Sequence, residues 1–214
     1  MNILPPSIPQ FGVNYDTGWI GFLAHDTFVA RGIEWFTRHW SGRGAIPAVS
    51  HVFVVVGDGQ CIEANADGVD VEPLSEYFQT PGCTVYLRRP KLWTAVLGHR
   101  IAAEALKYKG LPYDYDLIVA DAMSYSLVGR LMNEVTRDAL DGVLTSLADS
   151  DGKMICDKLA VVAMQAQPEL HPLGTLKLPA RENNPQRLFA DDGIFEADVT
   201  MIKGCVTNLF KTDY

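Results

Sequence analysis

Long apolar runs, a leader-like N-terminus and paired cysteines are all missing from this chain of 214 residues. No apolar run approaches the roughly 20 residues that a membrane-spanning helix needs. The first residues lack a basic segment followed by an apolar stretch, so we expect no signal peptide. Without export, the default expectation is a cytoplasmic protein whose thiols are reduced.

The four cysteines lie far apart, at Cys61, Cys83, Cys156 and Cys205. They form no Cys-x-x-Cys pair, so a zinc site built from thiolates is not expected. The acidic segments 149–151 and 191–192 lack the spacing of a calcium loop, and we expect turns there. The sequence therefore predicts neither a metal nor an organic cofactor.

Positive charge is also scarce, with 18 basic against 26 acidic side chains and a formal net charge of −8. Such a balance argues against electrostatic binding to nucleic acid phosphates or to anionic lipid. The one tight basic cluster is Arg88, Arg89 and Lys91. We expect it to end a strand on a solvated edge of a sheet.

Hydrophobic residues make up 48% of the chain, enough to fill the core of one large domain or of a domain with an insertion. The patterning predicts strands over about 19–23, 51–56, 60–64, 69–74, 84–88 and 194–202, with a further β-rich stretch at 205–210. It predicts helices over about 26–40, 94–108, 117–149 and 156–167, after an irregular lead-in at 1–17. Short strands joined by hairpins rather than by βαβ units indicate an α+β fold.

A histidine opens the strand at 51–56, and the next strand carries a glutamate. If the Gly-Asp-Gly stretch at 57–59 is a three-residue loop, Val56 pairs with Gln60 and Phe53 pairs with Glu63. Glu63 then lies on the same face as His51, one diagonal step away. A two-residue loop would move Glu63 to the opposite face.

Cys156 lies in the first turn or two of the predicted helix at 156–167. Unpaired backbone N–H groups and the helix dipole favour a thiolate there. With His51 as a base and Glu63 to orient its ring, the residues make up a cysteine-nucleophile site. Taken singly, each residue has an ordinary structural interpretation: a small buried hydrophobe, a hydrogen-bonded core histidine and a solvated hairpin charge.

The order of these residues resembles that of the circularly permuted papain-fold hydrolases of the NlpC-like superfamily. The resemblance is nearest to the YiiX/YaeF-like amidase group, with lecithin retinol acyltransferase as a more distant cousin. The matching pieces are Ser50-His51-Val52, Ile62-Glu63-Ala64, Gly68-Val69, Pro73-Leu74, residues 110–114, Cys156 with Leu159, and a proline turn at 185–188. Together they cover most of residues 18–200.

The resemblance implies a single domain over 1–214 with a circularly permuted papain-like fold, in which an antiparallel sheet packs on helices. It implies Cys156 as the nucleophile, His51 as the base and Glu63 as the orienting residue, with the backbone N–H of Cys156 donating to the oxyanion. Tyr113 and Asp114 match a Tyr-Asp pair of the family, and we expect them to shape the substrate cleft. A helical insertion at about 117–150 is expected to form a lid or an interaction surface.

The expected function is hydrolysis or acyl transfer at an amide or ester, with a peptide, a peptidoglycan fragment or a lipid as the substrate. One departure works against it, since the family often has Ser and Glu directly after the cysteine and this chain has Asp157 and Lys158. The charge of Asp157 disfavours a thiolate beside it. Two alternatives therefore stay open: a non-catalytic binding module that keeps the fold, and a structural protein of a larger assembly.

Overall fold

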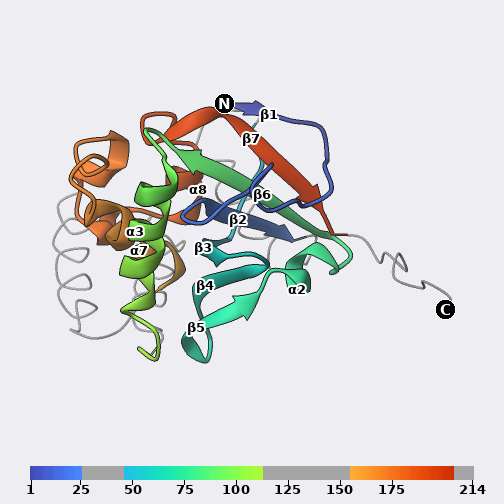
Figure 1. Ribbon diagram of the computed structural model, residues 1–214, viewed down its shortest axis with the longest axis horizontal. Coiled ribbons are helices and arrows are strands. Elements are labelled where there is room, and N and C mark those ends of the chain that lie inside the picture. The colour runs from blue at the N-terminus through green and yellow to red at the C-terminus, as the bar shows by residue number, and fades with distance from the viewer. Residues whose placement is uncertain (26–45, 113–154, 205–214) are drawn as a thin grey trace, which may run out of the picture.

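The computed structural model describes residues 1–25, 46–112 and 155–204 as an α+β fold, in which a seven-stranded mixed sheet packs against helices (Figure 1). The strand order is β1-β7-β6-β2-β3-β4-β5. The helix predicted at 26–40, the insertion predicted at 117–150 and the β-rich stretch at 205–210 lie outside the described residues.

The strands are β1 (Asn2–Ile3), β2 (Ile20–His25), β3 (His51–Gly57), β4 (Gln60–Asn65), β5 (Gly68–Pro73), β6 (Cys83–Pro90) and β7 (Phe195–Lys203). The described α-helices are α2 (Ser75–Phe78), α3 (Ala95–Leu106), α7 (Cys156–Gln165) and α8 (Pro185–Phe189), with 3₁₀ turns η1 (Gly174–Lys177) and η2 (Ala180–Glu182). None of these described helices has the length and apolarity to cross a membrane.

The sheet is mixed rather than fully antiparallel, which corrects the prediction. The neighbouring pairs from β7 through β5 are antiparallel, but β1 pairs with β7 in parallel through Asn2 and Ile3. The lead-in was therefore wrongly expected to be irregular throughout. A strand of two residues is too short to show any alternation of polar and apolar residues, so its sequence gives no strand signal.

The β3–β4 hairpin reaches the predicted pairing by a different route. Gly57, not Val56, pairs with Gln60, so the turn proper is Asp58-Gly59, and Gly59 has a positive φ of 66°. A register shift between Val55 and Gly57 makes a β-bulge. The extra residue in the bulge restores the register that a two-residue turn would lose. Phe53 consequently pairs with Glu63, as predicted.

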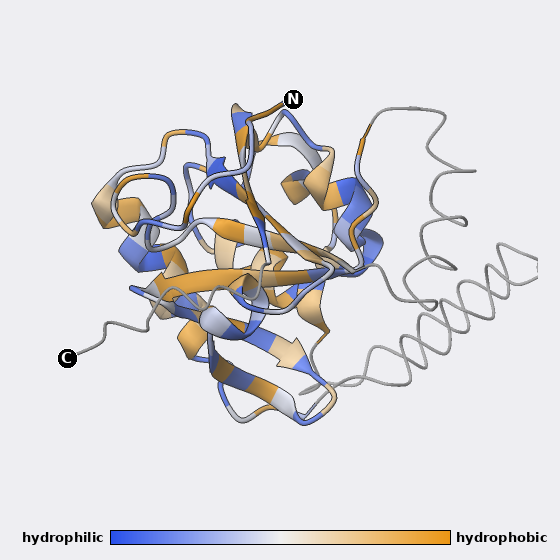
Figure 2. Cartoon of the chain, turned by 90° about the vertical axis from the view of Figure 1, so that its right-hand side faces the viewer, coloured by the Kyte–Doolittle hydropathy of each residue, from blue (hydrophilic) through white to orange (hydrophobic). Residues whose placement is uncertain are grey.

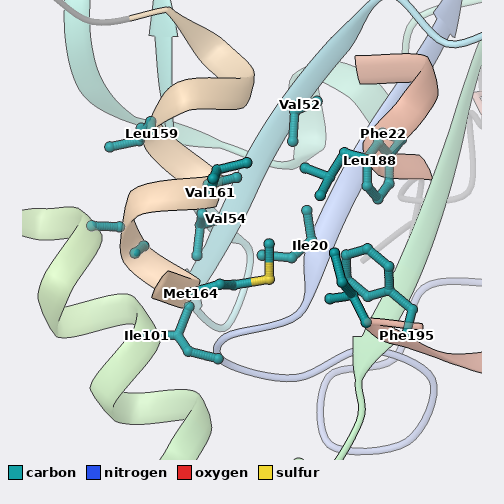
Figure 3. Close-up of a cluster of buried hydrophobic side chains, with 14 of the residues drawn as sticks. Ile20, Phe22, Val52, Val54, Ile101, Leu159, Val161, Met164, Leu188 and Phe195 are labelled. Atoms are coloured by element: carbon teal, nitrogen blue, oxygen red, sulfur yellow. The ribbon is translucent and has the colours of Figure 1, made fainter. Parts of the chain in front are cut away.

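The larger core lies between the sheet and the helices α3, α7 and α8. Figure 3 shows Val52 and Val54 of β3 facing Val161 and Met164 of α7, with Ile101 of α3 beside them. Thr94 caps α3 by accepting a hydrogen bond from the N–H of Leu97 at 3.1 Å. Helix α7 ends shortly before Pro168, because a residue that precedes proline avoids the helical conformation.

A second, smaller core covers the opposite face of the sheet, built from residues such as Phe53, Val55 and Cys61, with Tyr77 packed against it. Apolar residues on both faces make the middle of β3 a continuous buried run. Figure 2 shows the central strands as predominantly hydrophobic. Since Phe53 and Val55 belong to this second core while Val52 and Val54 belong to the first, the alternation predicted for the strand is confirmed.

Arg88 contradicts the expected solvated edge. Strand β6 lies between β7 and β2, and Arg88 is fully buried. Its guanidinium donates to Asp192 Oδ1 at 2.8 Å and to the carbonyl oxygens of Phe189 and Glu196, and it lies 4.8 Å from the centre of the Phe195 ring. An arginine can be buried when partners such as these satisfy its charge and its donors. The partners are distant in the sequence, so the local clustering of basic residues could not predict them.

Gly21 on β2 is required by the second core, because the Phe53 ring lies directly over it. A Cβ at Gly21 would lie 2.0 Å from Cζ of Phe53, whereas a Cβ at Gly57 would meet nothing closer than 3.9 Å. We expect Gly21→Ala to lower the free energy of unfolding by about 2–4 kcal/mol, as overpacking does. The matched control, Gly57→Ala, should change it by less than about 1 kcal/mol. Urea unfolding of both variants measures this, and equal effects would contradict the packing described for Phe53.

Candidate functional site

His51 is the first residue of β3, and backbone contacts fix the segment that leads into it. The N–H of Ser50 donates to the carbonyl of Leu23 at 2.9 Å. The side chain of Gln186, on α8, accepts from the N–H of Val49 at 3.0 Å and donates to the carbonyl of Pro47 at 3.2 Å. The start of β3 is therefore held from both the neighbouring strand and α8. The sequence indicated only a proline turn at 185–188 and did not predict the contacts of Gln186.

Glu63 lies on β4 and points at the His51 ring. Its side chain is only 4% exposed, against 22% for His51, and its Oε2 lies 2.8 Å from Nε2 of His51. The pairing of Phe53 with Glu63 gives Glu63 and His51 the same face of the sheet. The bulged hairpin is thus the local feature that brings these two predicted residues together.

Two further side chains hold the Glu63 carboxylate. The hydroxyl of Tyr77, on α2, lies 2.6 Å from each carboxylate oxygen, and Nδ2 of Asn65 donates to Oε1 at 3.5 Å. Sequence reasoning missed both residues. Tyr77 belongs to a helix of four residues between two strands, which is too short for any helical periodicity to mark which side chain points inward.

Cys156 is the first residue of α7, after Ile155, whose extended backbone forms the N-cap. Its thiol is free, it is 7% exposed, and it interacts with the His51 ring by a hydrogen bond and by charge. Because Nε2 of His51 faces Glu63, Nδ1 is the ring nitrogen that remains for the thiol. A first-turn N–H has no acceptor within its own helix, so the backbone of Cys156 offers a donor beside the sulfur.

His51, Glu63 and Cys156 meet where β3 and α7 begin, rather than in the middle of one face of the sheet. Helix α7 packs into the larger core, while His51 and Glu63 follow the face of the smaller one. They come together because His51 is the terminal residue of β3 and Cys156 the terminal residue of α7. Side chains at element ends keep access to solvent that mid-element positions lose, and His51 is indeed partly exposed.

The electrostatics of the His51–Glu63 pair favour charged partners. Burial by itself lowers the pKa of His51, but the charge and hydrogen bond of Cys156, followed by those of Glu63, outweigh it and raise the pKa from 6.5 to about 10. For Glu63, burial by itself raises the pKa, and the hydrogen bond and charge of His51 with the Tyr77 and Asn65 contacts bring it below its usual value. The ring is thus held as an imidazolium beside a carboxylate.

The other described cysteines have different surroundings. Burial, reinforced by the charges of Glu63, Glu72 and Glu76, raises the pKa of Cys61, and burial raises that of Cys83 to about 11. Both thiols are therefore held neutral at physiological pH. Cys156 has the His51 imidazole as a partner.

The remaining predicted site residues have mixed outcomes. Tyr113 and Asp114 lie outside the described residues. Asp157, which follows the cysteine, is buried at 3% exposure. In residues 1–25, 46–112 and 155–204, no group of three or more His, Cys, Asp or Glu side chains is arranged to hold a metal ion.

Neither the protein-family models nor the curated proteins give a relative from which a function can be transferred. No protein-family model matches the chain, and no curated protein matches it. A function for this chain therefore has to be inferred from the geometry of its described residues.

The raised pKa of His51 predicts a pH dependence of stability. A histidine with a raised folded-state pKa contributes stability fully below the unfolded-state value of 6.5 and loses it as the pH rises through about 10. We expect the advantage of the wild type over His51→Gln in free energy of unfolding to be largest at low pH and to be lost as the pH rises through about 10. Urea unfolding at several pH values measures it.

The matched control for losing a histidine is His99→Gln, at an exposed position on α3. A difference between the wild type and His51→Gln that stays constant up to and beyond about pH 10 would show that the ring is neutral in the folded protein. If His99→Gln lowers the free energy of unfolding by the same amount and with the same pH dependence, the effect belongs to the loss of any histidine and not to the position of His51.

Proposed function

We propose that this protein is a cysteine hydrolase or acyltransferase that acts on an amide or ester through an acyl-enzyme. Cys156 is the nucleophile, His51 the proton carrier and Glu63 the orienting carboxylate. The observation that carries the proposal is the position of the His51 ring, which contacts the Glu63 carboxylate through Nε2 and interacts with the thiol of Cys156. Nucleophile, base and orienting group in this order are the parts of an activated-nucleophile site.

The chemistry follows from that order. The sulfur of Cys156, its proton having passed to His51, bonds to the substrate carbonyl carbon, and the π electron pair moves to the oxygen. The backbone N–H of Cys156 donates to this oxyanion. As the tetrahedral intermediate collapses, the bond to the leaving amine or alcohol breaks, and His51 protonates the leaving group. An acyl group then remains on Cys156 as a thioester.

The second half of the cycle reverses the direction of the proton. His51 takes a proton from water, or from an acceptor alcohol or amine, as that molecule attacks the thioester. The acyl group leaves with the attacking oxygen or nitrogen, and the proton returns from His51 to the sulfur. Glu63 keeps Nε2 of the ring engaged throughout, so that Nδ1 stays directed at the reacting atoms.

The same proposal extends to the fold family. The described order of a histidine strand, a glutamate strand and a cysteine helix, with α7 packed on β3, supports a circularly permuted papain-like arrangement. Under this proposal Tyr113 and Asp114 shape the cleft, and residues 117–150 form a helical lid or an interaction surface. A free nucleophilic thiol also fits the reducing cytoplasm that the sequence predicts.

The competing function is a binding module that keeps the fold without catalysis. The burial of Asp157 directly after the cysteine favours it, because a carboxylate beside a thiol opposes thiolate formation. This alternative predicts that Cys156→Ser leaves every activity of the protein intact.

An activated ester separates the two functions. We expect p-nitrophenyl acetate to give a burst of nitrophenolate from the wild type, with the acetyl group found on Cys156 by peptide mass spectrometry. His51→Ala should slow acetylation by about 10²-fold or more, the contribution of a positioned proton carrier. Cys156→Ala should abolish the burst.

The control is Cys83→Ala, which removes a buried thiol outside the site. It should keep the full burst if it remains folded, as judged by circular dichroism. A burst that survives in Cys156→Ala, or acetylation of Cys156 at the same rate with and without His51, would refute the proposed function.

A further inference from the structure

The Glu63 carboxylate is held by a tyrosine that takes no direct part in the proposed chemistry. The Tyr77 hydroxyl lies 2.6 Å from both Oε1 and Oε2, shorter than the 2.8 Å contact of Oε2 with His51. A hydroxyl that contacts both oxygens fixes the plane of the carboxylate as well as its position. Contacts as short as these are typical of an O–H donor to an ionised acceptor.

The ring of Tyr77 is itself immobilised by stacking. It lies parallel to Phe53, with ring centres 5.6 Å apart and an interplanar angle of 6°. Phe53 in turn lies over Gly21, where a Cβ would come within 2.0 Å of its ring. Glu63 is the strand partner of Phe53, so the stacked rings and the carboxylate share one face of the sheet.

We propose that Tyr77 is a positioning residue: its hydroxyl fixes the Glu63 carboxylate so that one oxygen engages Nε2 of His51 and Nδ1 stays directed at Cys156. The inference rests on the proposed function, because positioning has a consequence for rate only if the thiol reacts. The Tyr77 hydroxyl contacts the Glu63 carboxylate, so Tyr77 acts through Glu63.

The charged and titratable neighbours of Glu63 set the sign of the expected effect. His51 on β3 and the Tyr77 hydroxyl on α2 stabilise its ionised form. Its negative charge interacts with Cys61 on its own strand and with Glu72 on β5. Asp70 lies opposite Glu63 across the β4–β5 pair and forms an ion pair with Lys109. Removing the hydroxyl therefore removes a donor to the charged form, and the pKa of Glu63 must rise.

The test uses Tyr77→Phe, which keeps the stacked ring and loses only the hydroxyl. The matched control is Tyr15→Phe, because Tyr15 is buried in the same smaller core but its hydroxyl bonds to Asp58 at 3.4 Å instead of Glu63. The first measurement is the titration of the Glu63 side-chain carboxyl by ¹³C NMR in a Cys156→Ala background, where the proposed nucleophile is absent. We expect the midpoint to rise by about one pH unit in Tyr77→Phe and to stay unchanged in Tyr15→Phe.

The second measurement is the rate of Cys156 acetylation by p-nitrophenyl acetate against pH, with the thiol present. The acid limb of this profile should move to higher pH in Tyr77→Phe, because a less firmly held Glu63 carboxylate stabilises the imidazolium and its thiolate partner less. It should not move in Tyr15→Phe. A residue that only packed the core would change stability without displacing this limb.

The outcomes separate this inference from the proposed function. A Glu63 midpoint that does not respond to Tyr77→Phe overturns the inference, whatever the thiol does. A midpoint that rises while the acid limb stays in place also overturns it, because the carboxylate then has no bearing on the reaction. If the midpoint rises but no variant is acetylated at Cys156, the proposed function fails while the link from Tyr77 to Glu63 stands.

Discussion

The hydrogen bond between Nε2 of His51 and the Glu63 carboxylate is the interaction on which the rest of this site depends. It fixes which ring nitrogen faces the thiol, and it adds to the larger effect of Cys156 in keeping the largely buried ring charged. Its geometry is set by the bulged β3–β4 hairpin, since a two-residue turn without the bulge would send Glu63 to the other face. A local irregularity of one residue thus decides whether the two side chains meet.

The surrounding fold holds the His51 and Glu63 side chains, and Cys156 beside them, in place. Each of the three is held by an element that the larger packing fixes: His51 by the contacts of Gln186 with the segment before β3, Glu63 by Tyr77, and Cys156 by a helix packed into the main core. Buried polar networks are stable only when their members are satisfied, and here each oxygen of Glu63 has a donor. The Glu63 carboxylate therefore stays ionised beside the His51 ring instead of taking up a proton.

Some of this was predictable from sequence and some was not, for identifiable reasons. The strand beginning at His51, its pairing with Glu63 and the helix beginning at Cys156 follow from alternation, turn residues and helical spacing, which are local signals. The bulge at Val56, the parallel pairing of β1, the burial of Arg88 and the contact of Tyr77 with Glu63 depend on partners distant in the sequence or on elements of two to four residues. Local patterns of polar and apolar residues predict neither contacts between distant residues nor elements as short as these.

The activation of Cys156 by His51 is tested most directly by the alkylation rate of each cysteine with iodoacetamide, mapped by mass spectrometry in the wild type and in His51→Ala. We predict that at neutral pH Cys156 is labelled at least about tenfold faster than Cys61 and Cys83, whose pKa values burial raises, and that His51→Ala removes this difference. If Cys156 is labelled only when the protein unfolds, or at a rate indifferent to His51, the thiol is not activated and these three residues do not form a catalytic site.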